Sequence, residues 1–193
     1  KKGDTVMLVL KRHYQFWFCM LALHKIGAIA IPATNQLVEH DFDYRYKAAR
    51  VKAIVCTNDG DVSLEAEKAA LEFPGMIKVL VGGSKEGWND FNVEMERFST
   101  HFYRTENTPC GNDPMLMLFT SGTTGKGKGV MLSQTAFLTN IYAGLQLISV
   151  GDRSISVLPP HHTFGSTINL LGNLLVGSNV YITSGIKYLM KEM

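Results

Sequence analysis

Short apolar runs alternate with helix-forming segments along the first half of the chain. Four short apolar runs predict strands: Val6–Leu10, Ala28–Ile31, Ala53–Cys56 and Ile77–Val81. The first of them, Val6–Leu10, lacks polar alternation, which is typical of a strand buried on both faces of a sheet. Three segments between them have helical length and spacing: Tyr14–Ile26, which is apolar nearly all round and should pack deeply, Glu39–Ala49 and Leu64–Leu71. Strands that alternate with helices through short turns predict an α/β fold with a mainly parallel sheet flanked by helices.

The pattern changes near residue 99, where we expect a boundary between two subdomains. Residues 1–98 form the first β-α-β subdomain, which ends in an apolar stripe at helical spacing that should face the core: Trp88, Phe91, Met95 and Phe98. Residues 99–114 are polar, hold two prolines and have no period, as in a linker. Residues 115–193 form the second subdomain, which we expect to be incomplete at its C-terminus. Its strands are predicted at Met115–Phe119, Val130–Leu132, Ser154–Leu158 and Asn179–Ile182, and its helices at Gln134–Ile148, capped by Ser133, and Phe164–Leu175.

Composition narrows the class of protein. The 193 residues are 46% apolar and 19% charged, as in an ordinary globular protein. Nineteen basic residues against 17 acidic ones give a net charge of +2, too balanced for a nucleic-acid binder. The most apolar segment, Phe16–Leu23, is too short to span a bilayer, so we expect no stable membrane anchor. Cys19, Cys56 and Cys110 are odd in number and far apart, which predicts free thiols and a reducing, cytoplasmic setting.

A glycine-rich stretch between two apolar runs is the strongest chemical signal. Five small residues, Ser121–Gly125, follow the predicted strand that ends at Phe119, and Lys126 and Lys128 come next. Small residues let backbone N–H groups and hydroxyls approach one anion closely, and the lysines add positive charge. Our first hypothesis is therefore a loop that binds the phosphates of a nucleotide.

Two other interpretations compete with this hypothesis. From Gly122, the spacing fits the P-loop pattern through Lys128, but that pattern needs Ser or Thr where this chain has Gly129. A P-loop lysine also opens a helix, whereas the strand-like Val130–Leu132 follows here. A glycine-rich hairpin without any ligand is the second alternative.

The same residues resemble a known family. Thr120-Ser121-Gly122-Thr123-Thr124-Gly125, followed by Lys128-Gly129-Val130, is similar to the phosphate-binding signature of the adenylate-forming superfamily, which includes acyl-CoA synthetases. The family usually has Pro before the lysine, and this chain has Gly127. The resemblance implies that Thr120 to Gly125 and Lys128 bind the nucleotide phosphates, and that Lys128 also acts in catalysis.

A pair of histidines forms a second candidate. His161 and His162 follow Pro159-Pro160 where a predicted strand ends and a helix begins, and ligands in open α/β sheets gather at such ends. Taken alone, the pair could equally fill a turn or cap a helix. A metal site is disfavoured because no third ligand lies at useful spacing. The family resemblance matches Pro159, His162 and Gly165 to a second motif, which implies that His162 lies beside the reacting carboxylate and α-phosphate.

Weaker similarity to acyl-CoA synthetases runs through Lys2-Gly3-Asp4, Gly27 to Pro32, and Lys52-Ala53-Ile54, so the resemblance covers the whole chain. It implies part of the large N-terminal domain of an ATP-dependent, AMP-forming ligase. That ligase would join a carboxylic acid, expected to be fatty, to CoA through an acyl-adenylate. ATP, Mg²⁺ and CoA are the implied cofactors, with the Mg²⁺ ligands largely downstream. The chain alone is expected to be inactive. An amino-acid- or aryl-acid-adenylating domain and a non-catalytic binding module stay as alternatives.

Overall fold

One large sheet organises most of the molecule. In the computed structural model, which describes residues 1–120 and 127–192, seven strands pair in the order β5-β4-β3-β1-β2-β6-β7. All of these neighbours are parallel except β6 and β7, which form an antiparallel pair. A second sheet consists of β8 and β9. The strands are β1 (Thr5–Val9), β2 (Ile29–Pro32), β3 (Ala53–Thr57), β4 (Ile77–Val81), β5 (Asn89–Asp90), β6 (Pro114–Thr120), β7 (Lys128–Ser133), β8 (Arg153–Ser156) and β9 (Asn179–Ile182). The predicted, mainly parallel α/β fold is confirmed.

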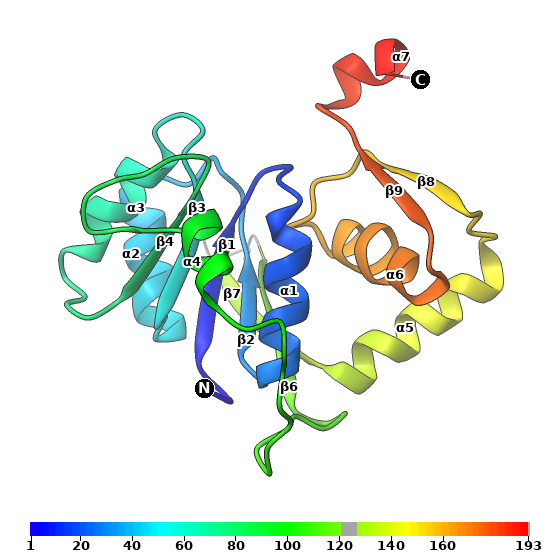
Figure 1. The fold of residues 1–193 in the computed structure, drawn as a ribbon, viewed down its shortest axis with the longest axis horizontal. Coiled ribbons are helices and arrows are strands. Elements are labelled where there is room, and N and C mark those ends of the chain that lie inside the picture. Colours follow the sequence, from blue (N-terminus) through cyan, green and yellow to red (C-terminus); the bar gives the residue numbers. More distant parts are fainter. Residues whose placement is uncertain (121–126, 193) are drawn as a thin grey trace.

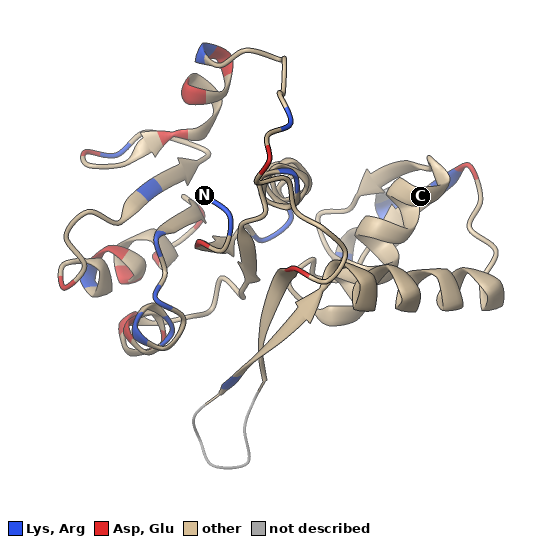
Figure 2. Ribbon diagram, turned by 90° about the horizontal axis from the view of Figure 1, so that it is seen from below, with Lys and Arg blue, Asp and Glu red and all other residues tan. Residues whose placement is uncertain are grey.

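Helices cover both faces of the large sheet. The helices of the described chain are α1 (Gln15–Ile26), α2 (Glu39–Ala49), α3 (Val62–Ala70), α4 (Phe91–Arg97), α5 (Gln134–Leu147), the π-helix η1 (Gly165–Gly172), α6 (Asn173–Val176), the short 3-10 turn η2 (Ile186–Tyr188) and α7 (Leu189–Glu192). Helices α2 and α3 lie together on one side, and α5, α6, β8 and β9 form a group beyond α1 (Figure 1). Helix α5 carries no charged residue, whereas α2 and α3 carry many (Figure 2).

The absence of polar alternation in the early strands is explained by two cores, one on each face of the sheet. In β1, Met7 and Val9 face the core under α2 and α3, while Leu8 faces the core under α1 and α5. In β3, Ile54 and Val55 divide between the same two cores. Successive residues of a strand point to opposite faces, so a sheet covered on both sides needs apolar residues at every position.

The large sheet contains strands from both sides of the polar stretch 99–114. This stretch holds no helix or strand before Pro114, and Leu116 of β6 pairs with Ala30 of β2. Strands β6 and β7 therefore extend the sheet that begins with β1. The division into subdomains 1–98 and 115–193 stays a prediction about domain organisation.

Two expectations about burial are wrong. Helix α1 buries a single face, because it lies on one side of the sheet and its other side meets solvent; Phe18 is 48% exposed. Of the predicted core stripe, Trp88 is buried but Phe98 is 74% exposed. Helix α4 is short and lies beside the two-residue edge strand β5. All seven of its residues are described, and none of them is buried.

The predicted strand and helix near the histidines also differ in detail. Strand β8 ends at Ser156 and is mostly exposed, since it pairs with β9 in a separate small sheet rather than joining the large one. The predicted helix over Phe164–Leu175 is a π-helix, η1, continued by α6. Ser133 does cap α5, as expected, and its Oγ accepts a hydrogen bond from the Ala136 N–H at 3.2 Å.

Helix α1 carries a buried histidine that should make stability depend on pH. Burial lowers the pKa of His24 to about 4, and among the described residues its Nε2 has no hydrogen-bond partner. The fold therefore favours the neutral ring. Above about pH 6.5 the ring is neutral in both the folded and the unfolded chain, and as the pH falls towards 4 the unfolded chain gains a proton that the folded chain does not, which lowers the free energy of unfolding. We expect the free energy of unfolding to fall between about pH 7 and about pH 4.5 by roughly 2 kcal/mol more in the wild type than in His24→Gln. Urea unfolding at both pH values measures this.

His40 provides the control, because its side chain is 83% exposed. The substitution His40→Gln should leave the pH dependence of unfolding as it is in the wild type. Equal pH dependence in His24→Gln and the wild type would contradict the assignment to His24.

Candidate functional site

The carboxyl ends of the parallel strands share one edge of the large sheet. Strands β1, β2, β3 and β6 run in the same direction, so Pro32, Thr57 and Thr120 end their strands at this edge. Ligands of open α/β sheets bind outside such an edge. Thr120, the last residue before the glycine-rich stretch in the sequence, therefore lies on the side where ligands are expected.

Strands β6 and β7 bring Thr120 and Lys128 into register. The two residues are opposite partners at the end of the antiparallel pair, and the Thr120 Oγ1 donates to the Lys128 carbonyl oxygen at 3.5 Å. Both side chains are exposed. The other residues assigned to phosphate binding, Ser121, Gly122, Thr123, Thr124 and Gly125, lie outside the described residues. Lys128 begins a strand rather than a helix, which agrees with our rejection of the P-loop pattern.

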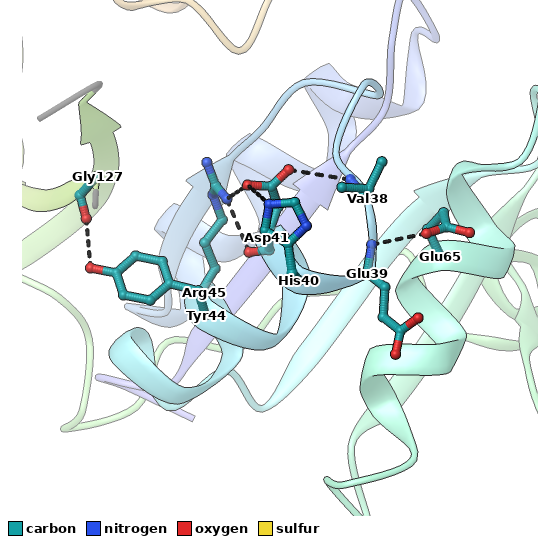
Figure 3. A network of polar contacts seen from close by, with 8 residues as sticks. All are labelled: Val38, Glu39, His40, Asp41, Tyr44, Arg45, Glu65 and Gly127. Atoms are coloured by element: carbon teal, nitrogen blue, oxygen red, sulfur yellow. Dashed lines mark hydrogen bonds and ion pairs between the residues drawn. The ribbon is translucent and has the colours of Figure 1, made fainter. Parts of the chain in front are cut away.

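Gly127 approaches the backbone at the end of β6 closely. A Cβ at this position would lie 2.6 Å from the Thr120 carbonyl oxygen, so the observed backbone leaves no room for a side chain. The Gly127 carbonyl oxygen accepts a hydrogen bond of 2.8 Å from the Tyr44 hydroxyl of α2 (Figure 3). Helix α2 is therefore attached to the chain immediately before Lys128.

The spacing Pro-x-x-His-x-x-Gly has a structural cause. The His162 N–H donates to the Pro159 carbonyl oxygen at 3.1 Å, and the Ser166 N–H donates to the His162 carbonyl oxygen at 2.8 Å. The Ser166 hydroxyl donates to Pro160 O at 2.5 Å. A Cβ on Gly165 would lie 2.3 Å from the Pro159 carbonyl oxygen, a backbone atom that cannot move away alone. These contacts fold 159–166 into one turn that opens η1 and holds the backbone of His162.

The two histidines differ in their surroundings. His161 is partly buried, and burial lowers its pKa, helped by the nearby His162 and Arg12. His162 is exposed. Together with the adjacent Thr163 they line a hollow of about 390 Å³ at the carboxyl edge, whose other lining residues come from three separate segments: Pro32, Ala33 and Thr34; Arg45; and Leu118, Phe119 and Thr120. The structure therefore brings His162 and Thr120, predicted separately, to one site.

A larger hollow of about 1040 Å³ adjoins this one. It lies between α2 and the base of the β6–β7 pair and is lined by His40, Asp41, Asp43, Tyr44, Arg45, Lys47, Ala48, Phe119, Thr120 and Gly127. Arg45, Phe119 and Thr120 line both hollows. The spacing of Glu39–Ala49 predicts a helix but does not indicate a role for Arg45, because nothing in the local pattern shows that this residue meets β6.

One arginine connects the large sheet with the part that carries the histidines. Arg12 follows β1, and its Nη2 donates to the Val157 carbonyl oxygen at 3.0 Å. Its Nη1 donates to the Ser184 carbonyl oxygen at 3.5 Å. Both acceptors come directly after the strands of the small sheet, so Arg12 holds that sheet beside the carboxyl edge of the large one.

The donors at this site suit a polyanion better than a metal ion. Thr120 offers a hydroxyl, and Lys128 and Arg45 offer cationic donors, which phosphates accept readily. Asp41, a carboxylate beside the larger hollow, is already paired with Arg45 at 3.4 Å. Across the described residues, no group of three His, Cys, Asp or Glu could hold a metal. Residues 1–120 and 127–192 also contain no helix long and apolar enough to cross a membrane.

Comparison with known proteins gives a consistent result. A family model described as AMP-binding enzyme matches residues 1–193. Human mitochondrial acyl-coenzyme A synthetase ACSM5 is 34% identical over 159 residues, which are 80% of this chain and 25% of that protein. Human mitochondrial acyl-coenzyme A synthetase ACSM4 is 33% identical over 141 residues, 70% of this chain and 23% of that protein. The chain thus spans about a quarter of the length of these relatives.

Solved structures share the fold. The anthranilate CoA ligase AuaEII in complex with anthranoyl-AMP superimposes with a TM-score of 0.87 at 20% identity, over 100% of this chain and 37% of that one. Apo MatB from Rhodopseudomonas palustris gives 0.79 at 22% identity, over 96% of this chain and 36% of that one. At these identities the likeness concerns the fold alone.

Proposed function

The chain belongs to the AMP-binding enzyme family, and from this premise we propose that it forms the phosphate-binding part of an ATP-dependent, AMP-forming carboxylic acid–CoA ligase. In the proposed reaction, a carboxylate oxygen attacks the α-phosphorus of ATP and the bond to pyrophosphate breaks, which leaves an acyl-adenylate. The thiol of CoA then attacks the acyl carbon, AMP departs, and an acyl thioester is formed. The acyl-CoA synthetase relatives support this proposal.

One observation carries the proposal within the structure. Thr120, at the start of the glycine-rich stretch, and His162, from a turn 42 residues later, line the same hollow at the carboxyl edge of the sheet. A ligand in that hollow can meet both Thr120 and the His162 imidazole. Transfer at an α-phosphate needs groups for both the leaving pyrophosphate and the attacking carboxylate, which lie on opposite sides of the phosphorus.

We assign the residues as follows. Thr120 and Lys128, with Ser121, Gly122, Thr123, Thr124 and Gly125, would hold the β- and γ-phosphates of ATP. Lys128 would stabilise the negative charge that develops on the departing pyrophosphate, since fixed donors aimed at developing charge lower the barrier. His162 would orient the carboxylate at the α-phosphate. We also propose Mg²⁺ as the metal that accompanies ATP, with its ligands largely downstream, as the family resemblance implies.

For the acid, we propose a fatty acid, because the relatives at 33–34% identity are acyl-coenzyme A synthetases. An aryl acid is the alternative substrate, because one protein of the same fold is an anthranilate CoA ligase. For location, we propose a reducing compartment, as three free cysteines suggest. The relatives are named as mitochondrial, which favours the mitochondrion over the cytoplasm. Fractionation of cells that express the full-length protein decides between the two.

Carboxylate-dependent exchange of labelled pyrophosphate into ATP tests the proposed function. We expect the full-length protein to catalyse exchange only when a carboxylic acid is present, and to do so best with fatty acids. We also expect the 193-residue chain to form no acyl-CoA, since it spans about a quarter of its relatives. A rate of pyrophosphate exchange that does not change when a carboxylic acid is added would contradict the first expectation. Formation of acyl-CoA by the 193-residue chain would contradict the second.

The histidine pair provides a prediction with an internal control. We expect His162→Ala to slow pyrophosphate exchange roughly ten- to hundredfold, the cost of one hydrogen bond to a charged group. His161→Ala should have a smaller effect, because that ring is partly buried and the exposed imidazole belongs to His162. Exchange rates of both variants at saturating ATP measure the difference. A larger loss in His161→Ala would reverse the assignment.

A further inference from the structure

Helix α2 presents an arginine to the proposed phosphate site that the family motifs do not include. The Arg45 side chain is 18% exposed and lines both hollows together with Thr120. Its guanidinium lies over the Phe119 ring, 5.3 Å from the centroid, next to the last residue of β6. Arg45 therefore shares the hollow of His162 with Thr120, the residue at which β6 ends.

The hydrogen bonds of Arg45 leave part of its guanidinium available. Within the described residues, its polar contacts use Nη1 alone, which donates to the Asp41 carbonyl oxygen at 2.9 Å and to Asp41 Oδ1 at 3.4 Å (Figure 3). A guanidinium has five N–H donors in a planar fork that matches phosphate oxygens. The backbone carbonyl of Asp41 and the Phe119 ring fix the orientation of the fork, so a phosphate could bind without further ordering of the side chain.

Tyr44 supports the same site from the neighbouring position. Its hydroxyl donates to the Gly127 carbonyl oxygen at 2.8 Å, and its ring meets Phe119 edge-on with centroids 6.2 Å apart. Tyr44 and Arg45 thus hold the ends of β6 and β7 from one helix. The hydroxyl fixes the backbone next to Lys128, and the guanidinium faces the hollow.

We propose that Arg45 is a polyphosphate-binding residue, which contacts the pyrophosphate portion of ATP between Thr120 and His162, and that Tyr44 is the positioning residue that sets Gly127 and thereby Lys128. This proposal rests on the proposed function. Arg45 complements Lys128: one cation approaches the leaving pyrophosphate from α2 and the other from β7. The ligand class is a nucleoside triphosphate or free pyrophosphate, whose oxygens suit the fork equally.

Lys47 supplies a matched control. It carries the same charge on the same helix and lines the larger hollow, but it pairs with Asp43 at 2.7 Å and Glu72 at 2.9 Å and does not line the hollow of His162. We expect Arg45→Gln to weaken pyrophosphate binding to the chain about tenfold or more, as measured by calorimetric titration. Lys47→Gln should change the affinity less than about threefold. Arg45→Lys should fall between the wild type and Arg45→Gln, because it keeps the charge and loses the fork.

Asp41→Asn separates binding by Arg45 from a purely structural role. If Arg45 only stabilises α2 through Asp41, this variant should lose pyrophosphate affinity together with melting temperature. If Arg45 binds the ligand, removal of the competing carboxylate should leave the affinity equal to that of the wild type or higher. For Tyr44→Phe, we expect a lower rate of pyrophosphate exchange in the full-length protein at an unchanged melting temperature, because the Gly127 carbonyl oxygen loses its donor.

The outcomes distinguish this inference from the proposed function. If Lys128→Ala abolishes pyrophosphate binding while Arg45→Gln binds like the wild type, the role of Arg45 is refuted and the proposed function stands. If Arg45→Gln does not fold, loss of affinity in Asp41→Asn refutes the role and retained affinity supports it. If the wild-type chain binds neither pyrophosphate nor ATP at millimolar concentration, both the inference and the phosphate site of the proposed function are refuted.

Discussion

Replacing Lys128 with alanine should slow pyrophosphate exchange in the full-length protein by about a hundredfold to a thousandfold, the usual cost of removing one donor from a preorganised anion site. Lys128 opens β7 opposite Thr120, and its side chain is exposed at the carboxyl edge, where a departing pyrophosphate would accumulate charge. The rate of exchange of labelled pyrophosphate into ATP, at saturating acid and nucleotide, measures the effect. Lys128→Arg should recover part of the rate, since it restores the charge.

Lys52→Ala is the control for Lys128→Ala. Lys52 is also exposed, but it directly precedes β3 and so lies at the opposite edge of the sheet, away from the ends of β2 and β6. Its replacement should leave exchange within about twofold of the wild type, because charges separated by more than a Debye length are largely screened. Equal rates in Lys52→Ala and Lys128→Ala would remove Lys128 from the mechanism.

Gly165→Ala should impair both the stability and the activity of the protein. The new methyl would lie 2.3 Å from the Pro159 carbonyl oxygen and 3.1 Å from its carbonyl carbon, so the turn that carries His162 would have to open. Overpacking of this kind costs about 1–3 kcal/mol. The same Pro159 oxygen accepts the His162 N–H, and its displacement should therefore slow exchange at least as much as His162→Ala does. Urea unfolding and exchange rates on the same preparation measure both effects.

Gly172→Ala tests whether these losses come from the close approach at Gly165. Gly172 ends the same π-helix, and a Cβ there would meet its nearest neighbour, the Thr167 carbonyl oxygen, at an ordinary 3.5 Å. Alanine in a helix is favoured over glycine by roughly 0.5–1 kcal/mol, so this variant should be as stable as the wild type or slightly more so. A loss of stability similar to that of Gly165→Ala would show that η1 tolerates no added methyl.

Local patterns predicted the central strands of the large sheet well, because these strands are buried on both faces. An uninterrupted apolar run such as Val6–Leu10 leaves few alternatives to an interior strand, and the observed β1 spans Thr5–Val9. The same reasoning failed where burial depends on neighbours distant in sequence. Phe18 lies in an apolar segment, yet it is exposed because only one side of α1 meets the sheet.

The candidate site was predictable only in parts. Thr120, Lys128 and His162 stand in short patterns that resemble known motifs, but no pattern states that β6 and the turn at Pro159 line one hollow. Arg45 has no motif at all. It enters the site because α2 packs beside Phe119, a contact between residues 74 positions apart that only the folded chain reveals. Long-range packing, rather than local sequence, completes the site.

The contact that Arg12 makes with the small sheet does not depend on which side chains that part of the chain carries. Its guanidinium reaches across to the carbonyl oxygens of Val157 and Ser184, and a carbonyl is present whatever side chain occupies the position. Substitutions around His161 and His162 therefore leave these two hydrogen bonds in place, as long as Arg12 itself is retained. The side chains that line the hollow of His162 can therefore change while Arg12 keeps the small sheet attached to the large one.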